Sequence, residues 1–437
     1  MGVYLDHNAT SPLRPAVRSA LIEALDTLPG NPSSVHGPGR AARAALDNAR
    51  ERIARALGVA EGEILFTSGG TESNNLALRG LLSHATEAPQ GPSLVTTATE
   101  HPSILRPAEH LAQSGHRVVI VPVDGHGLVN TADLLAAALP AEASADDAQA
   151  AEAQAADALP VDAQATGGQA PSAPARLISV CAAGGESAAV PDLPALGAAL
   201  TALPPQDRPL FHTDATQALG RLPLALDEWG VDLASFSAHK FGGPRGVGIL
   251  YRSPRAALKP QLLGGEQELG LRPGTENVAS IVATAVAVEL AIEEQESLAR
   301  RATAHIALLL ELLAQRIPAV RLTGPPAVFD QDGAHQTAHR AAHLPRRLPN
   351  TATLLIPGVE GRILATRLDL AGLEASAGSA CASGSLEPSL ALLAMGYSET
   401  DARAGLRLST GWNTTEEDIH RAVDILWTTL AGRAARR

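Results

Sequence analysis

The chain has 437 residues, 45% of them hydrophobic and 18% charged, with a formal net charge of −12. This length exceeds the usual size of a single core, so two domains are expected, and the negative charge argues against nucleic acid as a partner. No apolar run approaches the ~20 residues that span a bilayer, and the two cysteines, Cys181 and Cys381, favour the reducing cytoplasm over a disulfide framework.

The N-terminal region predicts a short edge strand at Val3–Leu5 and a helix that begins after Pro12. It has no basic region followed by an apolar core, so we expect no secretory signal and a cytoplasmic location. Residues 30–36 form a turn-rich loop before an amphipathic helix over Gly39–Leu57. Asn31, in that loop, is typical of a turn asparagine.

Two strand ends then carry groups of chemical interest. Ile64–Thr67 is a predicted strand, and the small residues that follow, including Gly70 and Thr71, open a helix whose N-terminus suits an anion. The spacing of a dinucleotide fingerprint is absent. A second strand, Leu94–Thr97, precedes His101, which could cap the helix after it. Another strand follows at Val118–Pro122.

Residues 141–175 contain six acids and neither lysine nor arginine, and without them the net charge would be −6. The composition predicts a disordered insertion, with a loose alanine-rich helix as the alternative. The sheet resumes at Leu177–Cys181.

The segment Leu210–Tyr251 combines strands with reactive residues. One strand ends in His212, Thr213 and Asp214, and the next, Leu233–Phe236, leads directly to Lys240. The residues between them have helix-compatible apolar spacing, broken or kinked by Pro223. A third strand, Val247–Tyr251, ends the segment.

An acid after one strand and a lysine after the next suit pyridoxal phosphate, which needs a Schiff-base lysine and a carboxylate at its pyridinium nitrogen. Ser237 and His239 are donors of the kind that a phosphate accepts. The alternative is a solvated surface lysine, the usual place of a lysine. Because the chain has only two lysines, Lys240 and Lys259, we favour the cofactor.

Downstream, the sequence predicts helix from Val278 to about Leu313, a strand over Asn350–Leu355 and a helix that starts near Arg362. His335, His339 and His343 have a spacing that a helix could use to bind a metal, although a solvated loop is the favoured interpretation.

Cys381 lies among glycines and serines, in GSACASGS, whereas Cys181 lies in an apolar run. A structural cysteine is usually buried among apolar residues, so Cys381 is predicted to be an exposed and reactive thiol.

The phrase SFSAHKFGGPRGVGILY resembles the lysine segment of the cysteine desulfurases of the NifS/IscS type, in the class V aminotransferase group. YLDHNATSP, GNPSSVH, SGGTES, TEHPS and GSACASGS are similar to further phrases of that family, in the same order. The resemblance implies an α/β fold of the aspartate aminotransferase type: a large pyridoxal-phosphate-binding domain with a mainly parallel sheet over 14–258, and a smaller α+β domain from 1–13 and 259–437.

The resemblance also implies a role for each matching residue. The cofactor would be held by Gly70, Thr71, Asp214, Gln217, Ser237, Ala238, His239 and Lys240, and by Thr275 from the neighbouring subunit of a homodimer. The substrate would contact Arg407, which the resemblance favours as a carboxylate clamp over an internal ion pair, and Asn31, equally well explained as a turn residue. Lys240, His101 and Cys381 would be catalytic.

The sequence departs from the family at two places. The family carries Asn-Asn-Glu where this chain has Gly184-Gly185-Glu186, and Glu266 replaces a glycine of the family's Gly-Gly-Gly-Gln-Glu phrase. The lost asparagine would remove one hydrogen bond to the cofactor's phenolic oxygen, worth about 0.5–1.5 kcal/mol, and Gln217 remains as a donor there.

The reaction implied is the conversion of L-cysteine to L-alanine, with the sulfur carried as a persulfide on Cys381 and passed to a protein acceptor for iron–sulfur clusters. Through that persulfide Cys381 is also a candidate iron–sulfur ligand. Two alternatives stay open: another class V activity, such as selenocysteine lysis or transamination, and a degenerate scaffold without activity.

Overall fold

The computed structural model describes residues 2–82, 93–140, 171, 173–327, 344–378 and 387–434. Its centre is a seven-stranded sheet of order β2-β8-β7-β6-β5-β3-β4, in which only β8 runs antiparallel to its neighbours. This mainly parallel sheet confirms the predicted fold class. The strands are β2 (Ile64–Thr67), β3 (Leu94–Thr97), β4 (Val118–Val121), β5 (Leu177–Ser179), β6 (Leu210–Asp214), β7 (Leu233–Ser237) and β8 (Gly248–Arg252).

Helices cover both faces of this sheet, which explains why its strands are almost continuously buried. Neighbouring residues alternate between two cores: Phe66 joins one, and Leu65 joins the other. The first core includes residues of α1 (Pro15–Thr27), α2 (Gly37–Leu57), α5 (Thr131–Ala138), α6 (Leu193–Thr201) and α7 (Val278–Glu293), and the second includes residues of α3 (Gly70–Leu82) and α4 (Pro102–Gln113).

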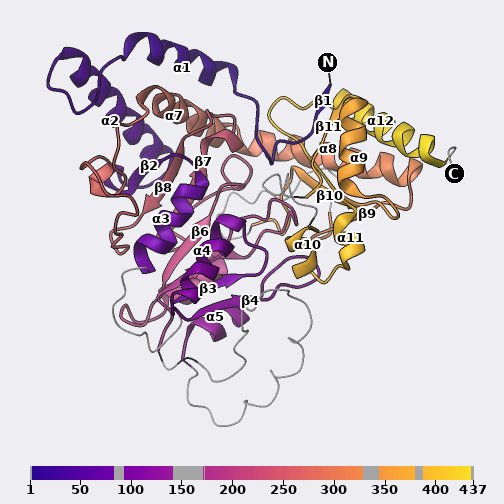
Figure 1. Ribbon diagram of the computed structural model, residues 1–437, viewed down its shortest axis with the longest axis horizontal. Coiled ribbons are helices and arrows are strands. Elements are labelled where there is room, and N and C mark those ends of the chain that lie inside the picture. The colour runs from indigo at the N-terminus through magenta and orange to yellow at the C-terminus, as the bar shows by residue number, and fades with distance from the viewer. Residues whose placement is uncertain are drawn as a thin grey trace.

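A smaller α+β body lies beside the large one and contains both ends of the described chain (Figure 1). Its core joins a three-stranded antiparallel sheet, a two-stranded sheet and their helices. The strands are β1 (Val3–Tyr4), β9 (Arg321–Leu322), β10 (Thr351–Leu355), β11 (Leu373–Glu374) and β12 (Gly405–Ser409). The helices are α8 (Gln295–Arg316), α9 (Gly361–Leu370), α10 (Leu390–Ala394), α11 (Glu399–Arg403) and α12 (Glu416–Ala434).

Three features differ from the sequence analysis. The segment between β6 and β7 is a series of turns, because Gly220 and Gly230 adopt positive φ on either side of Pro223. The helix expected from Val278 onward is divided at Glu294 into α7 and α8. Finally, α7 packs on the large core against α1 and α2, so the change of core follows α7 and does not occur at residue 258.

Short 3-10 turns connect several of these elements: η1 (Glu61–Glu63), η2 (Ala238–Lys240) and η3 (Glu268–Gly270). Among the described residues, no helix is both long enough and apolar enough to cross a bilayer.

Candidate active site

Asp214 and Lys240 come together at one edge of the central sheet. Asp214 is the last residue of β6, and Lys240 ends the turn η2 that directly follows β7, the parallel neighbour of β6. Ligands of open α/β sheets bind outside the carboxyl ends of the strands, so this edge is the expected place for a site. The Lys240 ammonium donates to the carbonyl oxygens of Asn8 at 2.6 Å and Ala9 at 3.0 Å.

The Asp214 carboxylate is buried and fixed by two donors. Its Oδ2 accepts a hydrogen bond from the Asn74 amide at 2.7 Å, and its Oδ1 accepts one from the backbone N–H of Thr216 at 3.0 Å. A fixed carboxylate here suits a cationic ring nitrogen.

The start of α3 forms a cradle of small residues beside these groups. A Cβ on Gly70 would lie 2.9 Å from Thr216 Oγ1 and 3.5 Å from Ser237 Cβ, so only glycine fits without a shift. The Thr216 hydroxyl is buried and has no hydrogen-bond partner among the described residues. Together with the free N–H groups of the first helical turn, including that of Thr71, it offers donors to a phosphate.

η2 itself is held against the N-terminal segment. His239 Nδ1 lies 3.0 Å from Thr10 Oγ1, and the His239 backbone carbonyl accepts a hydrogen bond from Ser11 N at 2.8 Å. Burial, with the nearby charge of Lys240, lowers the pKa of His239 to about 4, so its imidazole is neutral near pH 7. Ala238 is fully buried, and a Cβ on Gly243 would lie 2.9 Å from its Cβ, so only glycine fits at 243 without a shift.

His101 is the N-cap residue of α4 and is exposed. Its Nδ1 accepts from the backbone N–H of Ser103 at 3.1 Å and lies 2.7 Å from Ser103 Oγ. The capping that the sequence suggested as the simpler role is therefore present, and the predicted stacking on a cofactor ring stays a prediction.

Asn8 links the two bodies, and sequence reasoning assigned it no role. Its carbonyl oxygen accepts from Lys240 and from the Gln217 amide at 3.0 Å, and its side chain donates to Gly185 O at 3.0 Å and Thr351 Oγ1 at 2.9 Å. It is 1% exposed. Its position in the phrase DHNAT, three residues after a strand, was the available signal.

Arg221 is a second cation next to Lys240. It donates to the backbone carbonyls of His7 at 3.4 Å and Lys240 at 3.3 Å, and to the side-chain oxygen of Gln217. Burial, with the charge of Arg407, lowers the pKa of Arg221 to about 10. The site therefore carries several positive groups, which favours an anionic occupant.

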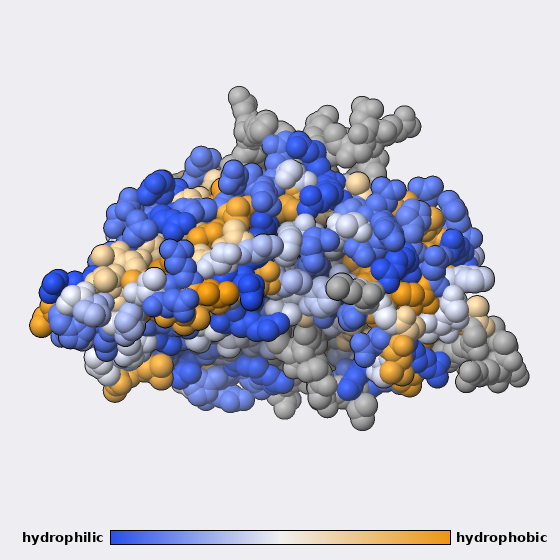
Figure 2. Space-filling view, turned by 90° about the horizontal axis from the view of Figure 1, so that it is seen from above, coloured by the Kyte–Doolittle hydropathy of each residue, from blue (hydrophilic) through white to orange (hydrophobic). Residues whose placement is uncertain are grey.

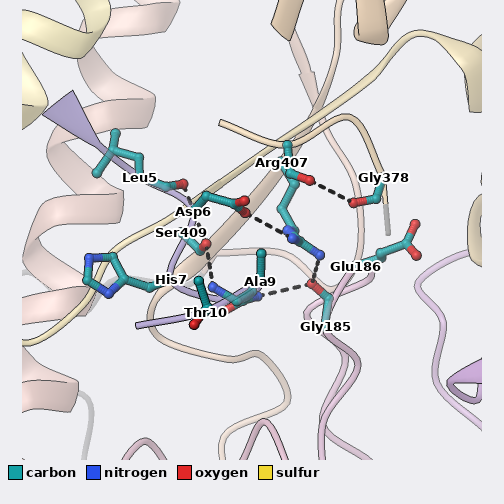
Figure 3. Close-up of polar contacts among 12 residues, drawn as sticks. Leu5, Asp6, His7, Ala9, Thr10, Gly185, Glu186, Gly378, Arg407 and Ser409 are labelled. Carbon is teal, nitrogen blue, oxygen red and sulfur yellow. Dashed lines mark hydrogen bonds and ion pairs between the residues drawn. The ribbon is translucent and has the colours of Figure 1, made fainter. Parts of the chain in front are cut away.

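Arg407 lies in the middle of β12, and its side chain points toward Asp6 and Gly185 (Figure 3). Its guanidinium pairs with Asp6 Oδ1 at 3.0 Å and donates to Gly185 O at 3.3 Å, and Arg407 Nε is buried without a partner among the described residues. The internal ion pair that the sequence analysis held as the alternative is thus observed. A substrate carboxylate would compete with Asp6 for this guanidinium.

Gly184 and Gly185, where the sequence departs from the family, lie close to the side chains of Ser187 and Gln217. A Cβ on Gly184 would lie 2.1 Å from Ser187 Oγ, and one on Gly185 would lie 3.1 Å from Gln217 Nε2. Side chains at these positions would require Ser187 and Gln217 to move. The loop contributes its backbone carbonyl at Gly185 to Asn8 and Arg407 instead.

Cys381 lies outside the described residues, but the chain on both sides of its segment is placed. On one side, Ser376 pairs with Arg407 through two backbone hydrogen bonds of 3.1 and 2.6 Å. On the other side, Ser389 donates to the Glu186 carboxylate at 2.5 Å. The described residues before the segment 379–386 therefore reach Arg407 through Ser376, and those after it reach Glu186 through Ser389.

The remaining predicted residues lie apart from this cluster or outside the described parts. Asn31 is exposed, and its side chain accepts from Ser33 N at 2.9 Å, as in a simple turn. Thr275 is exposed on a loop. His335, His339 and His343, and most of the insertion 141–175, are outside the described residues. Within the described ranges, no group of three His, Cys, Asp or Glu residues is arranged to hold a metal.

These residues fit pyridoxal phosphate in three respects. Asp214 offers a buried carboxylate, Lys240 offers a primary amine at the end of the neighbouring strand, and the cradle at Gly70 offers unpaired donors. A cation-binding carboxylate, an amine and an anion cradle are what a pyridinium aldehyde phosphate requires.

Comparisons with known proteins agree with this geometry. The aminotransferase class-V family model matches residues 3–144 and 169–422. The chain is 36% identical over 424 residues to "Cysteine desulfurase IscS" of Dictyoglomus turgidum, covering 97% of this chain and 93% of the relative. It is 35% identical over 430 residues to a "Cysteine desulfurase" of Cereibacter sphaeroides, covering 97% and 94%.

Solved structures give the same result. A "NifS-like protein" superposes with a TM-score of 0.80 at 29% identity, covering 99% of this chain and all (100%) of the other. "SspA in complex with cysteine" superposes with a TM-score of 0.70 at 26% identity, covering 93% and 98%.

Proposed function

This chain belongs to the aminotransferase class-V family and is a cysteine desulfurase, and on that premise we propose how it uses pyridoxal phosphate and Cys381. The products are L-alanine and a persulfide on Cys381. The observation that carries the proposal is the arrangement of Lys240, Asp214 and Arg407 around Asn8 and Gly185, together with the contacts of Ser376 and Ser389, which lie on either side of the segment that contains Cys381.

Each residue has a separate task. Pyridoxal phosphate, when bound, supplies the electron sink for the carbanion at the substrate α-carbon. Asp214 holds the ring nitrogen as a cation, and Lys240 anchors the cofactor and then accepts the α-proton. Gly70, Thr71, Ser237, Ala238 and His239 would hold the phosphate, Gln217 would donate to the phenolic oxygen, and His101 would hold the ring and transfer protons.

Arg407 selects an amino-acid substrate through its carboxylate. A guanidinium and a carboxylate form two parallel hydrogen bonds, and Arg407 presents two nitrogens that now contact Asp6 and Gly185. L-cysteine would replace one or both of these contacts. Asn31 is the second proposed substrate contact and comes from the loop before α2.

Cys381 completes the transfer. Its thiolate attacks the substrate sulfur, so that a sulfur–sulfur bond forms, the carbon–sulfur bond breaks, and its electron pair remains on the carbon skeleton that leaves as alanine. The persulfide then passes its outer sulfur to an acceptor thiol of a partner protein. Iron–sulfur cluster assembly is the proposed destination, since the relatives include enzymes named IscS. Through this sulfur Cys381 would contact the iron of a nascent cluster.

The test compares purified wild type with Cys381→Ser and Lys240→Ala. Wild type should bind the cofactor, with its visible absorption, and convert L-cysteine to equal amounts of alanine and thiol-releasable sulfide. Cys381→Ser should keep the absorption and lose sulfide release, while Lys240→Ala should lose both products. Sulfide release by Cys381→Ser would contradict the proposed role. Wild type that binds no cofactor would instead support the scaffold alternative, and products other than alanine would indicate another class V reaction.

We also propose a homodimer in which Thr275 completes the partner's phosphate site. Thr275 is exposed, and the same region exposes three leucines: Leu262 at 58%, Leu263 at 92% and Leu269 at 65%. The view in Figure 2 shows apolar residues gathered in patches, including at the end of the molecule where α1 and α2 lie. Apolar surface of this kind is typical of a protein interface.

Mixed dimers test the shared site. Lys240→Ala and Thr275→Ala should each be impaired, whereas unfolding and refolding them together should restore activity, because half of each mixed dimer then contains both native residues. Leu263→Asp should shift the molecular mass measured by light scattering from dimer to monomer. A monomeric wild type, or mixing without recovery, would contradict the shared site.

A further inference from the structure

Asn74 lies one turn into α3 and is 1% exposed. Its amide nitrogen has two hydrogens, and each is donated to a different group: one to Asp214 Oδ2 at 2.7 Å and one to Ser103 Oγ at 2.8 Å. Asp214 belongs to β6 and Ser103 to α4, so this single side chain bridges two elements that each carry a proposed cofactor contact.

The chain of hydrogen bonds continues from Ser103 to His101. Ser103 Oγ lies 2.7 Å from His101 Nδ1, and the backbone N–H of Ser103 donates to the same nitrogen at 3.1 Å. His101 Nδ1 is therefore an acceptor, and the Ser103 hydroxyl must donate to it. The Ser103 hydroxyl oxygen accepts from Asn74. Each hydrogen bond in the series Asp214–Asn74–Ser103–His101 therefore has one assigned donor and one assigned acceptor.

The orientation of the Asn74 amide follows from the charge on Asp214. Asn74 Oδ1 is buried and has no hydrogen-bond partner within the described ranges. A flipped amide would place that oxygen against the Asp214 carboxylate and remove the donor to Ser103. The Asn74 side chain thus keeps both N–H hydrogen bonds and leaves its buried carbonyl oxygen without a partner within the described ranges. This orientation indicates that the role of Asn74 is to donate these two hydrogen bonds.

We propose that Asn74 is a positioning residue that couples Asp214 to His101 through Ser103. It holds the Asp214 carboxylate in place, and through the Ser103 hydroxyl it fixes the orientation of the His101 ring by its Nδ1. The proposal rests on the proposed function, because Asp214 and His101 matter together only if one cofactor lies between them.

Three variants separate the links. Asn74→Leu removes both donations, and Ser103→Ala removes only the link to His101. Asn75→Leu makes the same change one residue further on, where the amide donates within its own helix to Thr71 O at 3.0 Å. Asn74→Leu should weaken cofactor binding about tenfold, the loss of one hydrogen bond to a charge, and should shift the absorption maximum of the bound cofactor. Ser103→Ala should keep the affinity within about twofold and lower kcat with KM unchanged.

The coupling itself appears in the double variant. If the relay is one unit, Asn74→Leu with Ser103→Ala should lower kcat no further than Asn74→Leu alone. Fully additive losses in kcat, or an unchanged cofactor affinity and absorption in Asn74→Leu, would overturn the proposal. Asn75→Leu should match wild type in every measurement, and melting curves check that all variants fold.

A readout without the cofactor keeps this test separate from the proposed function. In protein labelled with ¹⁵N-histidine, Asp214→Asn should shift the His101 resonances, assigned by their absence in His101→Gln, and this shift should disappear when Ser103→Ala is added. A shift that persists in Ser103→Ala, or no shift at all, overturns the relay. If this coupling is observed in a protein that neither binds the cofactor nor releases sulfide, the relay stands and the proposed function fails.

Discussion

At the scale of single residues, the environment of Glu100 shows how the site controls charge. Glu100 is buried, and its Oε1 accepts from Thr97 Oγ1 at 2.9 Å and from Cys181 N at 2.8 Å. Burial, with a smaller contribution from the charge of Asp214, raises the pKa of Glu100 to about 8 against the lowering effect of the two donors. Near pH 7 Glu100 is therefore mostly a neutral acid, which leaves Asp214 as the negative charge available to the ring nitrogen.

This difference in pKa predicts how stability depends on pH. Unfolded Glu100 ionises near its ordinary value of 4.5, whereas folded Glu100 keeps its proton up to about 8. The native state binds more protons in that window, so this residue lowers the free energy of unfolding by about 1.4 kcal/mol for each pH unit between those values, with no further loss above them. Glu100→Gln, which cannot ionise, should unfold at similar urea concentrations to wild type at pH 4.5 and at higher ones at pH 8.5. Equal midpoints at both pH values would show that Glu100 is ionised in the folded protein.

Single residues of the candidate site could be predicted from the sequence where they stand at or just after the end of a predicted strand. Asp214 and Lys240 follow buried strands, and β6 and β7 are parallel neighbours, so their proximity followed from the pattern. Asn8, Asn74 and Ser103 could not be found in this way, because their partners come from other elements. Arg407 was predicted as a site residue from the resemblance, but only the fold shows that Asp6 already occupies part of its guanidinium.

At the scale of elements, the N-terminal segment connects the two bodies and supports Lys240. After β1 pairs with β11, residues 6–10 cross to the large body, where Asn8 O and Ala9 O accept from Lys240. Gly411, just after β12, lies against this segment: a Cβ there would be 1.9 Å from His7 Nδ1. His7 is buried and bonded through Nδ1 to Ser11 Oγ at 2.9 Å, so its ring has little room to move.

Gly411→Ala should therefore displace the segment that holds Lys240. We expect a loss of stability of about 1–3 kcal/mol, typical of overpacking at a buried site, together with weaker cofactor binding. Adding His7→Ala should recover much of the stability, because it removes the atoms that the new methyl group meets. Thermal unfolding and cofactor titration of the single and double variants measure both effects. If Gly411→Ala unfolds like wild type, the ring of His7 adapts and does not fix the segment.

Elements were predicted well where local signals agreed. The strands Ile64–Thr67 and Leu94–Thr97 are observed with the predicted bounds, since each is a short apolar run between turns. The helix after His101 also starts as expected, with Pro102 at its first position. The break at Glu294 carries neither glycine nor proline, so no local signal marks it, and packing of α7 and α8 on different cores decides it.

At the scale of the whole molecule, two cores share one site. The large core supplies Asp214 and Lys240, and the small one supplies Arg407 from β12. Asn8 and Gly185 contact residues of both, so the relative position of the cores sets the distance between the proposed cofactor and the proposed carboxylate clamp. The sequence indicated two domains from length alone, but the placement of α7 with the large core depended on tertiary contacts.

The last prediction concerns the acidic segment between α5 and β5. Ala175 N donates to Ala138 O at 2.6 Å, so the described residues on the two sides of this segment lie next to each other. The family model matches residues 3–144 and 169–422 and passes over most of this segment. Closing a loop between two neighbouring residues costs little entropy, and lengthening that loop raises the cost only slowly.

Replacing residues 141–172 by a short Gly-Ser linker should keep the melting temperature within about 2 °C and leave cofactor binding and desulfurase activity at the wild-type level. The net charge would fall in magnitude from −12 to −6, so solubility near the isoelectric point is the property expected to change. A second variant, with a Gly-Ser segment of the original length, separates the effect of length from that of charge. If the short variant loses stability or cofactor while the long one does not, the length of the segment matters to the fold; if both lose them, its side chains pack on the molecule, and the prediction of an independent insertion is wrong.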